Sequence, residues 1–187
     1  MRTFKLQVQT TVDGYMAGPN GEMDWVTFPW TDDIKAYVTA LTEPVDRIVL
    51  GRRLAEGFIP AWAAGPEGED QKSIDKMNDT PKVVISNSLT ESPWENATVA
   101  GGDLTETINR LKAQPGGDII AYGGGTLVSS LIAEGLLDEL HLFVNPTAIG
   151  TGMPVFPRGG AYQRLNLVTA QTFDCGVTAL HFEPKRS

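Results

Sequence analysis

The chain has 187 residues, of which 41% are hydrophobic and 20% charged, ordinary values for one globular domain that buries its core without disulfides or metal. Its formal net charge of −8, with no basic cluster beyond Arg52-Arg53, argues against nucleic acid or an anionic membrane as partner. The lone Cys175 cannot form an internal disulfide, and no apolar run suits a signal peptide or a membrane span. We therefore expect a soluble cytoplasmic protein with a single domain over residues 1–187.

The first predicted strand leads into a loop of unusual composition. Residues 4–11 alternate between apolar and polar side chains, which predicts a strand that ends at the turn dipeptide Asp13-Gly14. The loop that follows, GYMAGPNGEMDW over residues 14–25, mixes turn-forming residues with large apolar side chains. Such a loop either packs over the core through its own side chains or forms a flap beside a ligand. The sequence leaves both interpretations open.

A helix and a second strand come next. Apolar residues at a spacing of three and four predict a helix that has Thr31 or Asp32 as its N-cap and ends at Pro44; they are Ile34, Tyr37, Val38 and Leu41. Asp32 and Asp33 fall in its first turn, where the helix dipole favours negative charge. Residues 47–50 then predict a strand that runs into Gly51-Arg52-Arg53. The planar guanidinium of arginine suits phosphate oxygens, but arginine is also common on ordinary surfaces.

A polar stretch separates the second strand from the third. Residues 60–81 are polar and acidic, which predicts a surface excursion with one short helix around residues 73–77. Residues 82–85 predict a third strand, which stops at the small hydrogen-bonding residues Ser86-Asn87-Ser88. Asp103 and Glu106 have capping-box spacing ahead of a helix that Pro115-Gly116 ends.

Residues 118–145 predict a strand, a glycine turn, a helix and another strand. The apolar run 119–122 stops at Gly123-Gly124-Gly125, and Thr126 is the expected N-cap of a helix that ends near Gly135. A glycine turn that opens a helix suits an anionic group such as a pyrophosphate, because free N–H groups and the positive end of the helix dipole point there. Taken alone, the segment is equally compatible with a tight connection that binds nothing.

The C-terminal part predicts an antiparallel hairpin, with strands over residues 163–173 and 177–182 joined at Asp174-Cys175-Gly176. His141 and His181 fall inside strands, distant in sequence from any paired carboxylate or cysteine, and we expect each to be a packing or surface residue. One cysteine and two histidines cannot build a closed zinc site, so no metal is expected. The sequence also lacks the G-x-S-x-G elbow of common hydrolases.

Strands that alternate with helices predict an α/β fold: a mostly parallel central sheet, helices on both faces, and the C-terminal hairpin at one edge. Ligands of such sheets bind beyond the carboxyl ends of the strands. Three of these strand ends carry residues suited to phosphate: Gly51-Arg52-Arg53, Ser86-Asn87-Ser88 and Gly123-Gly124-Gly125-Thr126. Together they predict a dinucleotide that lies across the sheet.

The chain resembles a known family over nearly its whole length, and four segments carry the resemblance. They are VDGYMAGPNGEMDW, VLGRR, MNDTPKVVISNSL and YGGGTLVSSLIAEGLLDELHLFVNPTAIGTGMPVF. They resemble the dihydrofolate-reductase-like superfamily, in particular the reductase domain of riboflavin biosynthesis and its stand-alone relatives. The resemblance implies that the glycine turn holds the cofactor pyrophosphate and that the second and third strand ends hold its adenosine phosphate side. The cofactor-binding residues implied in this way are Gly51, Arg52, Arg53, Ser86, Asn87, Gly123, Gly124, Gly125, Thr126 and Leu127.

The cofactor of this family is usually NADPH. Two arginines near the ribose favour NADPH over NADH, because a 2′-phosphate needs positive charge nearby. The resemblance further implies a cis peptide bond between Gly123 and Gly124.

The substrate side is argued from the acidic residues. PWTDDIKAY resembles the part of dihydrofolate reductases in which an acid on a helix helps to protonate the pterin, which makes Asp33 the candidate catalytic residue, although its spacing from Trp30 is shorter than usual. Asp13, Asp24 and Trp25 are candidate substrate-binding residues. Between Leu6 and Val45 the only basic residue is Lys35, which departs from what a phosphorylated substrate would require on this flank, although Arg158 or Arg164 could come from elsewhere in the chain.

We therefore predict an NADPH-dependent reductase that resembles 5-amino-6-(5-phosphoribosylamino)uracil reductase. It would transfer a hydride to a C=N or C=O carbon of a pyrimidine- or pteridine-type substrate, with the proton coming from a carboxylate or water. A dihydrofolate reductase proper is one alternative, and a nucleotide-binding protein without turnover is another. The resemblance also allows a homodimer.

Overall fold

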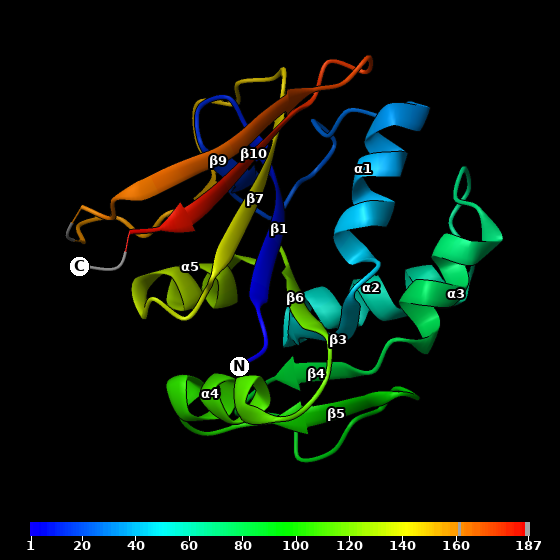
Figure 1. Ribbon diagram of the computed structural model, residues 1–187, viewed down its shortest axis with the longest axis vertical. Coiled ribbons are helices and arrows are strands. Elements are labelled where there is room, and N and C mark those ends of the chain that lie inside the picture. Colours follow the sequence, from blue (N-terminus) through cyan, green and yellow to red (C-terminus); the bar gives the residue numbers. More distant parts are fainter. Residues whose placement is uncertain (161, 186–187) are drawn as a thin grey trace.

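The computed structural model describes residues 1–160 and 162–185, and one eight-stranded sheet forms its centre (Figure 1). The strand order is β5-β4-β3-β6-β1-β7-β10-β9. The strands from β5 to β7 in this order are parallel, β10 is antiparallel to β7, and β9 is antiparallel to β10. Their bounds are β1 Phe4–Thr11, β3 Val45–Gly51, β4 Lys82–Ile85, β5 Ala97–Ala100, β6 Asp118–Tyr122, β7 Glu139–Asn145, β9 Leu165–Thr172 and β10 Thr178–Pro184.

Helices cover both faces of this sheet. The helices α4 and α5 lie on one side, and α1, α2 and α3 lie on the other (Figure 1). Their bounds are α1 Asp32–Thr42, α2 Arg52–Ala63, α3 Gln71–Asp79, α4 Leu104–Ala113 and α5 Gly125–Ala133. The predicted fold class is therefore confirmed.

The side chains that hold these layers are those that the apolar periodicity selects. Ile108 of α4 and Leu131 of α5 are fully buried in one cluster with Phe4 and Leu6 of β1. Burial of this kind is the main favourable term in folding, at about 25 cal/mol for each Å² of apolar surface removed from water. It fixes where α5 begins, and hence where the glycine turn lies.

The opposite face has two separate clusters. Ala55 of α2 and Met77 of α3 pack with Ile48 and Leu50 of β3. Beside them, α1 packs on the C-terminal half of the sheet, where Ile34 and Leu41 meet a cluster that contains Phe143 and Phe173. The helical spacing predicted for residues 31–43 is thus confirmed.

Three short strands were not predicted. β5 runs parallel to β4 as an edge strand, and β2 (Tyr15–Ala17) pairs antiparallel with β8 (Met153–Pro154) in a small second sheet. None of these three short segments has an apolar β-branched run like the one that predicts β4, and none is long enough to show a period of two, so only the partner strand reveals them. The β2–β8 pair joins the loop after β1 to the rim after β7.

The predicted turns contain glycines with a positive φ. Gly14, Gly135 and Gly176 have positive φ values of +88°, +63° and +91°, a backbone region that glycine enters without a steric penalty. They end β1, follow α5 and close the β9–β10 hairpin, as predicted.

Within the part of the chain that the structure describes, no helix combines the length and the apolar character needed to cross a bilayer.

We expect Leu131→Ala to lower the free energy of unfolding by about 2–5 kcal/mol, the usual cost of a cavity left by a buried leucine. Leu131 is 0% exposed in the cluster that positions α5. Leu167→Ala is the matched control, because Leu167 is 58% exposed on β9; its effect should stay within about 0.5 kcal/mol. Urea denaturation measures both values, and equal effects would contradict the packing of α5.

Candidate functional site

Three loops meet at the carboxyl edge of the sheet. β4, β3 and β6 are parallel neighbours, so the residues that follow them emerge side by side. These residues are Ser86 and Asn87 after β4, Gly51 to Arg53 at the start of α2, and the glycine turn between β6 and α5. The structure therefore brings the three predicted strand ends together, as the parallel arrangement requires.

The starts of α2 and α5 lie against each other. A Cβ added to Gly51 would be 3.4 Å from Cβ of Leu127 on α5, and a Cβ added to Gly124 would be 3.4 Å from Cβ of Leu54 on α2. Each helix thus presents a leucine to the glycine before the other helix. The two helix N-termini share one small region of surface.

Neither of these N-termini is neutralised by its own residues. The N-caps of α2 and α5 are Gly51 and Gly124, neither helix has a side-chain cap, and neither has an acidic residue in its first turn. In α3 and α4, by contrast, Asp70 and Asp103 accept a hydrogen bond from a backbone N–H of the first turn. The free N–H groups and positive dipole ends of α2 and α5 therefore suit an anion.

Two expectations about the glycine turn are wrong. The peptide bond between Gly123 and Gly124 is trans, since the cis bond in the described chain is Phe28-Pro29. Gly124 adopts an extended φ of 177°, which makes the turn without the roughly 2.5–4 kcal/mol that a cis bond costs outside proline. Thr126 is not the N-cap either, because the N-cap of α5 is Gly124 and the helix begins at Gly125.

Gly123 and Gly125 lie so close to neighbouring side chains that a Cβ atom would be crowded. A Cβ on Gly123 would lie 3.0 Å from Cγ2 of Val8, and one on Gly125 would lie 3.3 Å from Sδ of Met153. Both distances are tighter than normal carbon contacts. The rim that contains β8 thus lies directly beside the start of α5.

The two arginines differ in their surroundings. Arg52 Nη1 donates to Glu56 Oε1 at 2.8 Å within α2, a pair between two partly exposed side chains. Arg53 is exposed, and the described chain offers it no ion pair. Arg53 is therefore the guanidinium at this edge that remains available to a bound phosphate.

Ser86 and Asn87 use their side chains to shape the edge. Ser86 Oγ accepts from the backbone N–H groups of Ser88 and Leu89 at 3.2 and 3.1 Å. Asn87 Oδ1 accepts from the N–H of Gly102 at 2.7 Å and so joins the end of β4 to the segment after β5. Both residues lie at the end of β4, as predicted, and their side chains support the loop backbone.

The loop after β1 is attached to the same edge. Asp13 accepts from the N–H groups of Ile149 and Gly150, and Gly152 approaches Ala17 so closely that a Cβ would be 2.2 Å from its carbonyl oxygen. Hydrogen bonds from Thr11 and Gly150 lower the pKa of Asp13. Asp13 therefore secures the loop, while Asp24 is exposed and Trp25 is half-buried.

Asn145, which the sequence did not single out, anchors the far end of this loop. It is 0% exposed at the end of β7; its Oδ1 accepts from the N–H of Thr27 at 2.9 Å, and its Nδ2 donates to Gln9 Oε1 at 2.9 Å and Phe143 O at 3.0 Å. A polar residue at the end of an otherwise apolar strand was the available signal, because a buried amide must find partners.

Asp33 is also held in a network. Its Oδ1 accepts from the Thr31 hydroxyl and the Ile34 N–H, and its Oδ2 accepts from the Asp174 N–H at 2.9 Å. The bond from Thr31, followed by that from Asp174, holds the pKa of Asp33 below its usual value. The ionised carboxylate joins the start of α1 to the β9–β10 turn. Its catalytic role stays a prediction.

Comparison with known proteins shows the family to which the chain belongs. Residues 2–179 match the family described as the RibD C-terminal domain. The chain belongs to this family. It is 31% identical to the uncharacterized protein YyaP of Bacillus subtilis over 182 residues, which are 96% of this chain and 93% of YyaP.

Solved structures agree on the fold. A Shewanella sp. PV-4 protein named as a riboflavin biosynthesis protein superposes with a TM-score of 0.77 at 24% identity, covering 100% of both chains. The deaminase and 5-amino-6-(5-phosphoribosylamino)uracil reductase of Thermotoga maritima gives 0.70 at 15%, covering 98% of this chain and 57% of its own. Dihydrofolate reductase of Enterococcus faecalis, solved with NADP(H) and RAB-propyl, gives 0.65 at 14%, covering 98% and 97%. The fold is dihydrofolate-reductase-like, and the family is reductase-like.

We expect Asp33→Asn to lower the Tm at pH 7, because an asparagine NH₂ group cannot accept the bonds made to one carboxylate oxygen. A folded-state pKa below the unfolded value means that the stabilisation is present above the unfolded pKa of about 4 and is lost as the pH falls through the folded pKa. The difference in Tm between wild type and variant should therefore shrink below about pH 4. Thermal unfolding from pH 3 to pH 7 measures it.

Asp32→Asn is the control for this prediction. Asp32 lies in the same first turn of α1 and is exposed, so both variants lose the same interaction with the helix dipole. Equal Tm values for the two variants at pH 7 would contradict the anchoring role of Asp33.

Proposed function

We propose that this RibD-type domain is an NADPH-dependent reductase of a pyrimidine- or pteridine-type substrate. The observation that carries the proposal is the pair of uncapped helix N-termini, preceded by Gly51 and Gly124, that meet at adjacent strand ends. Two anion-binding helix starts a short distance apart suit a dinucleotide with phosphates at two places.

The residues at this edge fit such a cofactor. The backbone N–H groups at the start of α5 would hold the pyrophosphate, and the glycines before it keep side chains away from that backbone. Arg53 would face a 2′-phosphate, since it is exposed and unpaired within the described chain. Ser86 and Asn87 would shape the surface for the adenosine side through the loop that they brace.

The loop over residues 14–25 would cover the substrate, as it is tied to the rim by Asp13 and to β7 by Asn145. When bound, NADPH supplies a hydride to a C=N or C=O carbon. A general acid works best with a pKa near the working pH. Because its hydrogen bonds lower the pKa of Asp33, we assign the proton to water, with Asp33 as an anionic neighbour that orients it.

The charges at this edge favour a substrate without a phosphate. Lys35 is engaged, with its Nζ donating to the carbonyl oxygen of Gly68 at 3.0 Å. Of the two arginines that could serve a phosphate from elsewhere in the chain, Arg164 lies at the other edge, because its neighbour Gln163 donates to Ile132 near the C-terminal end of α5. The other, Arg158, is exposed on the rim after β8. The flank that the loop covers is otherwise acidic. We therefore favour a ring substrate over its ribosyl phosphate.

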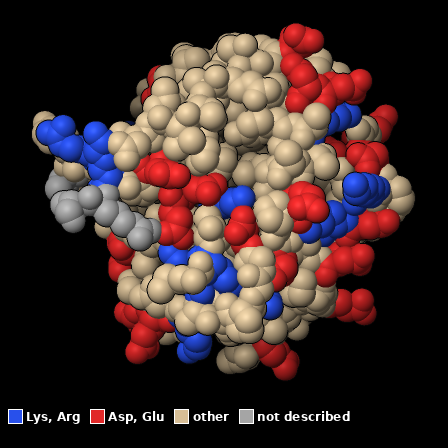
Figure 2. All heavy atoms as spheres, viewed as in Figure 1, with Lys and Arg blue, Asp and Glu red and all other residues tan. Residues whose placement is uncertain are grey.

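The surface gives no support for a polyanionic partner. Figure 2 shows acidic and basic side chains interspersed on the face in view, without a broad basic area, and the net charge is −8. We propose a cytoplasmic enzyme that acts on a small molecule without nucleic acid or membrane, and a homodimer remains a prediction.

We expect Arg53→Ala to weaken NADPH binding by about 1.5–3 kcal/mol while NADH binding changes little, since only NADPH carries the 2′-phosphate. Arg52→Ala should have a smaller effect, because Glu56 already engages Arg52. Isothermal titration with both cofactors measures the difference. Arg110→Ala, an exposed arginine of α4, is the control. If Arg53→Ala weakened both cofactors equally, Arg53 would have no place at the 2′-phosphate.

We expect purified protein to oxidise NADPH in the presence of a pyrimidine or pteridine ring substrate, and to prefer a dephosphorylated pyrimidine ribosylamine to its phosphate. Comparison of turnover between the ribosylamine and its phosphate isolates the effect of the phosphate group. A dihydropteridine tests the alternative that the protein is a dihydrofolate reductase. Absorbance of NADPH measures turnover. Binding of NADPH without turnover of any of these compounds would instead support a nucleotide-binding protein, and a preference for the phosphate would contradict the charge argument alone.

A further inference from the structure

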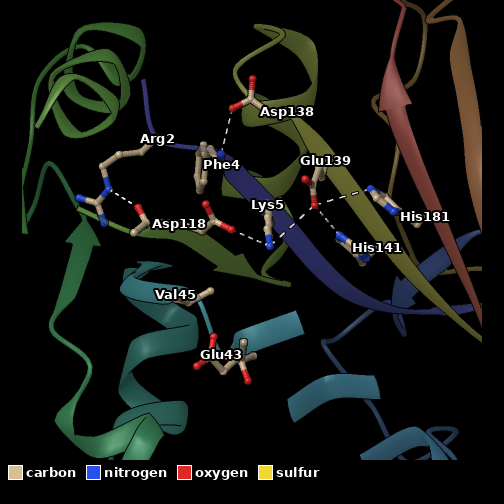
Figure 3. A network of polar contacts seen from close by, with 12 residues as sticks. Arg2, Phe4, Lys5, Glu43, Val45, Asp118, Asp138, Glu139, His141 and His181 are labelled. Atoms are coloured by element: carbon tan, nitrogen blue, oxygen red, sulfur yellow. Dashed lines mark hydrogen bonds and ion pairs between the residues drawn. The ribbon is translucent and has the colours of Figure 1, made fainter. Parts of the chain in front are cut away.

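A second group of reactive side chains lies at the amino edge of the sheet, opposite the candidate cofactor site. Glu139 and His141 of β7 and His181 of β10 converge there (Figure 3). Glu139 Oε2 is 3.0 Å from His141 Nε2 and 3.6 Å from His181 Nε2. These ligand-type atoms lie within 4.8 Å of one another.

The strand pairing produces this convergence. Glu139 and His141 are two residues apart and so share a face of β7, while His141 and His181 are direct partners across the β7–β10 ladder. The two imidazole rings stack with centroids 4.2 Å apart and planes at 19°. The sequence predicts that each histidine is a packing or surface residue. The structure adds that the two rings stack across the sheet and that both lie beside Glu139, two positions from His141.

The separations suit a metal ion. Oxygen and nitrogen ligands about 2.0–2.1 Å from a tetrahedral zinc ion lie about 3.3 Å apart, and the two carboxylate-to-imidazole distances of 3.0 and 3.6 Å bracket this value. His181 Nε2 is buried and has no hydrogen-bond partner among the described residues. A buried ring nitrogen without a hydrogen-bond partner is costly, and a bound metal ion would remove that cost.

A neighbouring side chain would orient the first imidazole. Tyr37 of α1 places its hydroxyl 3.3 Å from His141 Nδ1. His141 Nε2 is hydrogen-bonded to Glu139 Oε2, so a bound metal ion requires the tautomer with the proton on Nδ1. In that tautomer His141 donates to Tyr37 and directs its Nε2 lone pair towards the ion. Metal-binding histidines are usually held in this way by a second hydrogen bond.

The charges around the three side chains are compatible with a bound cation. Lys5 Nζ is 4.0 Å from Glu139 Oε2, but it is paired with Asp118 Oδ2 at 2.7 Å (Figure 3). Glu183, on the same strand as His181, also acts on that ring electrostatically. With neutral histidines, the group of Lys5, Asp118 and Glu139 has an excess of one negative charge. The Glu139 and His181 side chains are 22% and 16% exposed, so solvent can reach the group and supply a fourth ligand.

We propose that Glu139, His141 and His181 form a site for a zinc-like divalent transition metal, which joins β7 to β10 at the edge away from the cofactor. Two imidazoles and one carboxylate are a ligand set that such ions accept. The site acts on stability and does not take part in hydride transfer, because the candidate cofactor edge lies at the other end of the strands. It is independent of the proposed function.

The test is titration of tag-free protein with Zn²⁺, followed by calorimetry and by NMR of the histidine ring protons. The chain has only two histidines, so both sets of ring signals report on this site. We expect both sets to shift together with one equivalent of Zn²⁺ and the Tm to rise, because an ion that binds the folded state stabilises it.

Three variants define the ligands. His181→Gln should weaken Zn²⁺ binding by more than about tenfold, and Tyr37→Phe by about 10–100-fold, the usual effect of losing an orienting partner. Cys175→Ser should bind as wild type, because Cys175 lies in the β9–β10 turn at the other end of the hairpin. Far-UV circular dichroism confirms that each variant is folded, and Glu139→Gln replaces His181→Gln if the latter is not.

Two results would overturn the proposal. One is the absence of a shift in the histidine signals at millimolar Zn²⁺, which would leave the three residues as a hydrogen-bonded network only. The other is loss of binding in Cys175→Ser with retention in His181→Gln. Neither result bears on NADPH binding or turnover, so the proposed function is judged separately.

Discussion

The contact between the starts of α2 and α5 is the constraint on which the candidate site depends. Each helix is preceded by a glycine that faces a leucine of the other helix, and each leaves its first N–H groups without a side-chain cap. That arrangement requires β3 and β6 to be parallel neighbours and α5 to be held by buried residues such as Leu131. An uncapped helix start costs stability, and a bound anion would offset that cost.

The two ends of the parallel strands present different chemical groups. The carboxyl edge presents backbone N–H groups and loops, and Asp13 and Asp33 near it fasten those loops. The amino edge presents side chains in ionic contact, with Lys5 between Asp118 and Glu139 and the two stacked imidazoles beyond them. One sheet thus separates the surface proposed for a dinucleotide from the cluster proposed for a metal ion by the length of its strands.

The local predictions that succeeded rest on periodicity and on turn glycines, as for the helix of Ile34 and Leu41 and the turn at Gly176. Those that failed needed information from elsewhere in the chain. The short strand β8 exists because β2 lies beside it, and the start of α5 at Gly125 reflects its packing on Leu54 and Met153. The cis bond was transferred from a family pattern, and the extended backbone of Gly124 makes it unnecessary.

The sequence by itself determined the fold class and the three loops suited to phosphate, because hydrophobic period, glycine runs and capping residues are local signals. The family came from the resemblance of four segments to known proteins. Only the tertiary structure decided what each polar side chain does. It showed that Asp13 and Asp33 fasten loops, that Arg53 and not Arg52 lacks an ion-pair partner among the described residues, and that His141 and His181 meet at Glu139. Such assignments depend on which backbone groups and charges lie within hydrogen-bonding distance, and the packing of the strands, helices and loops sets that.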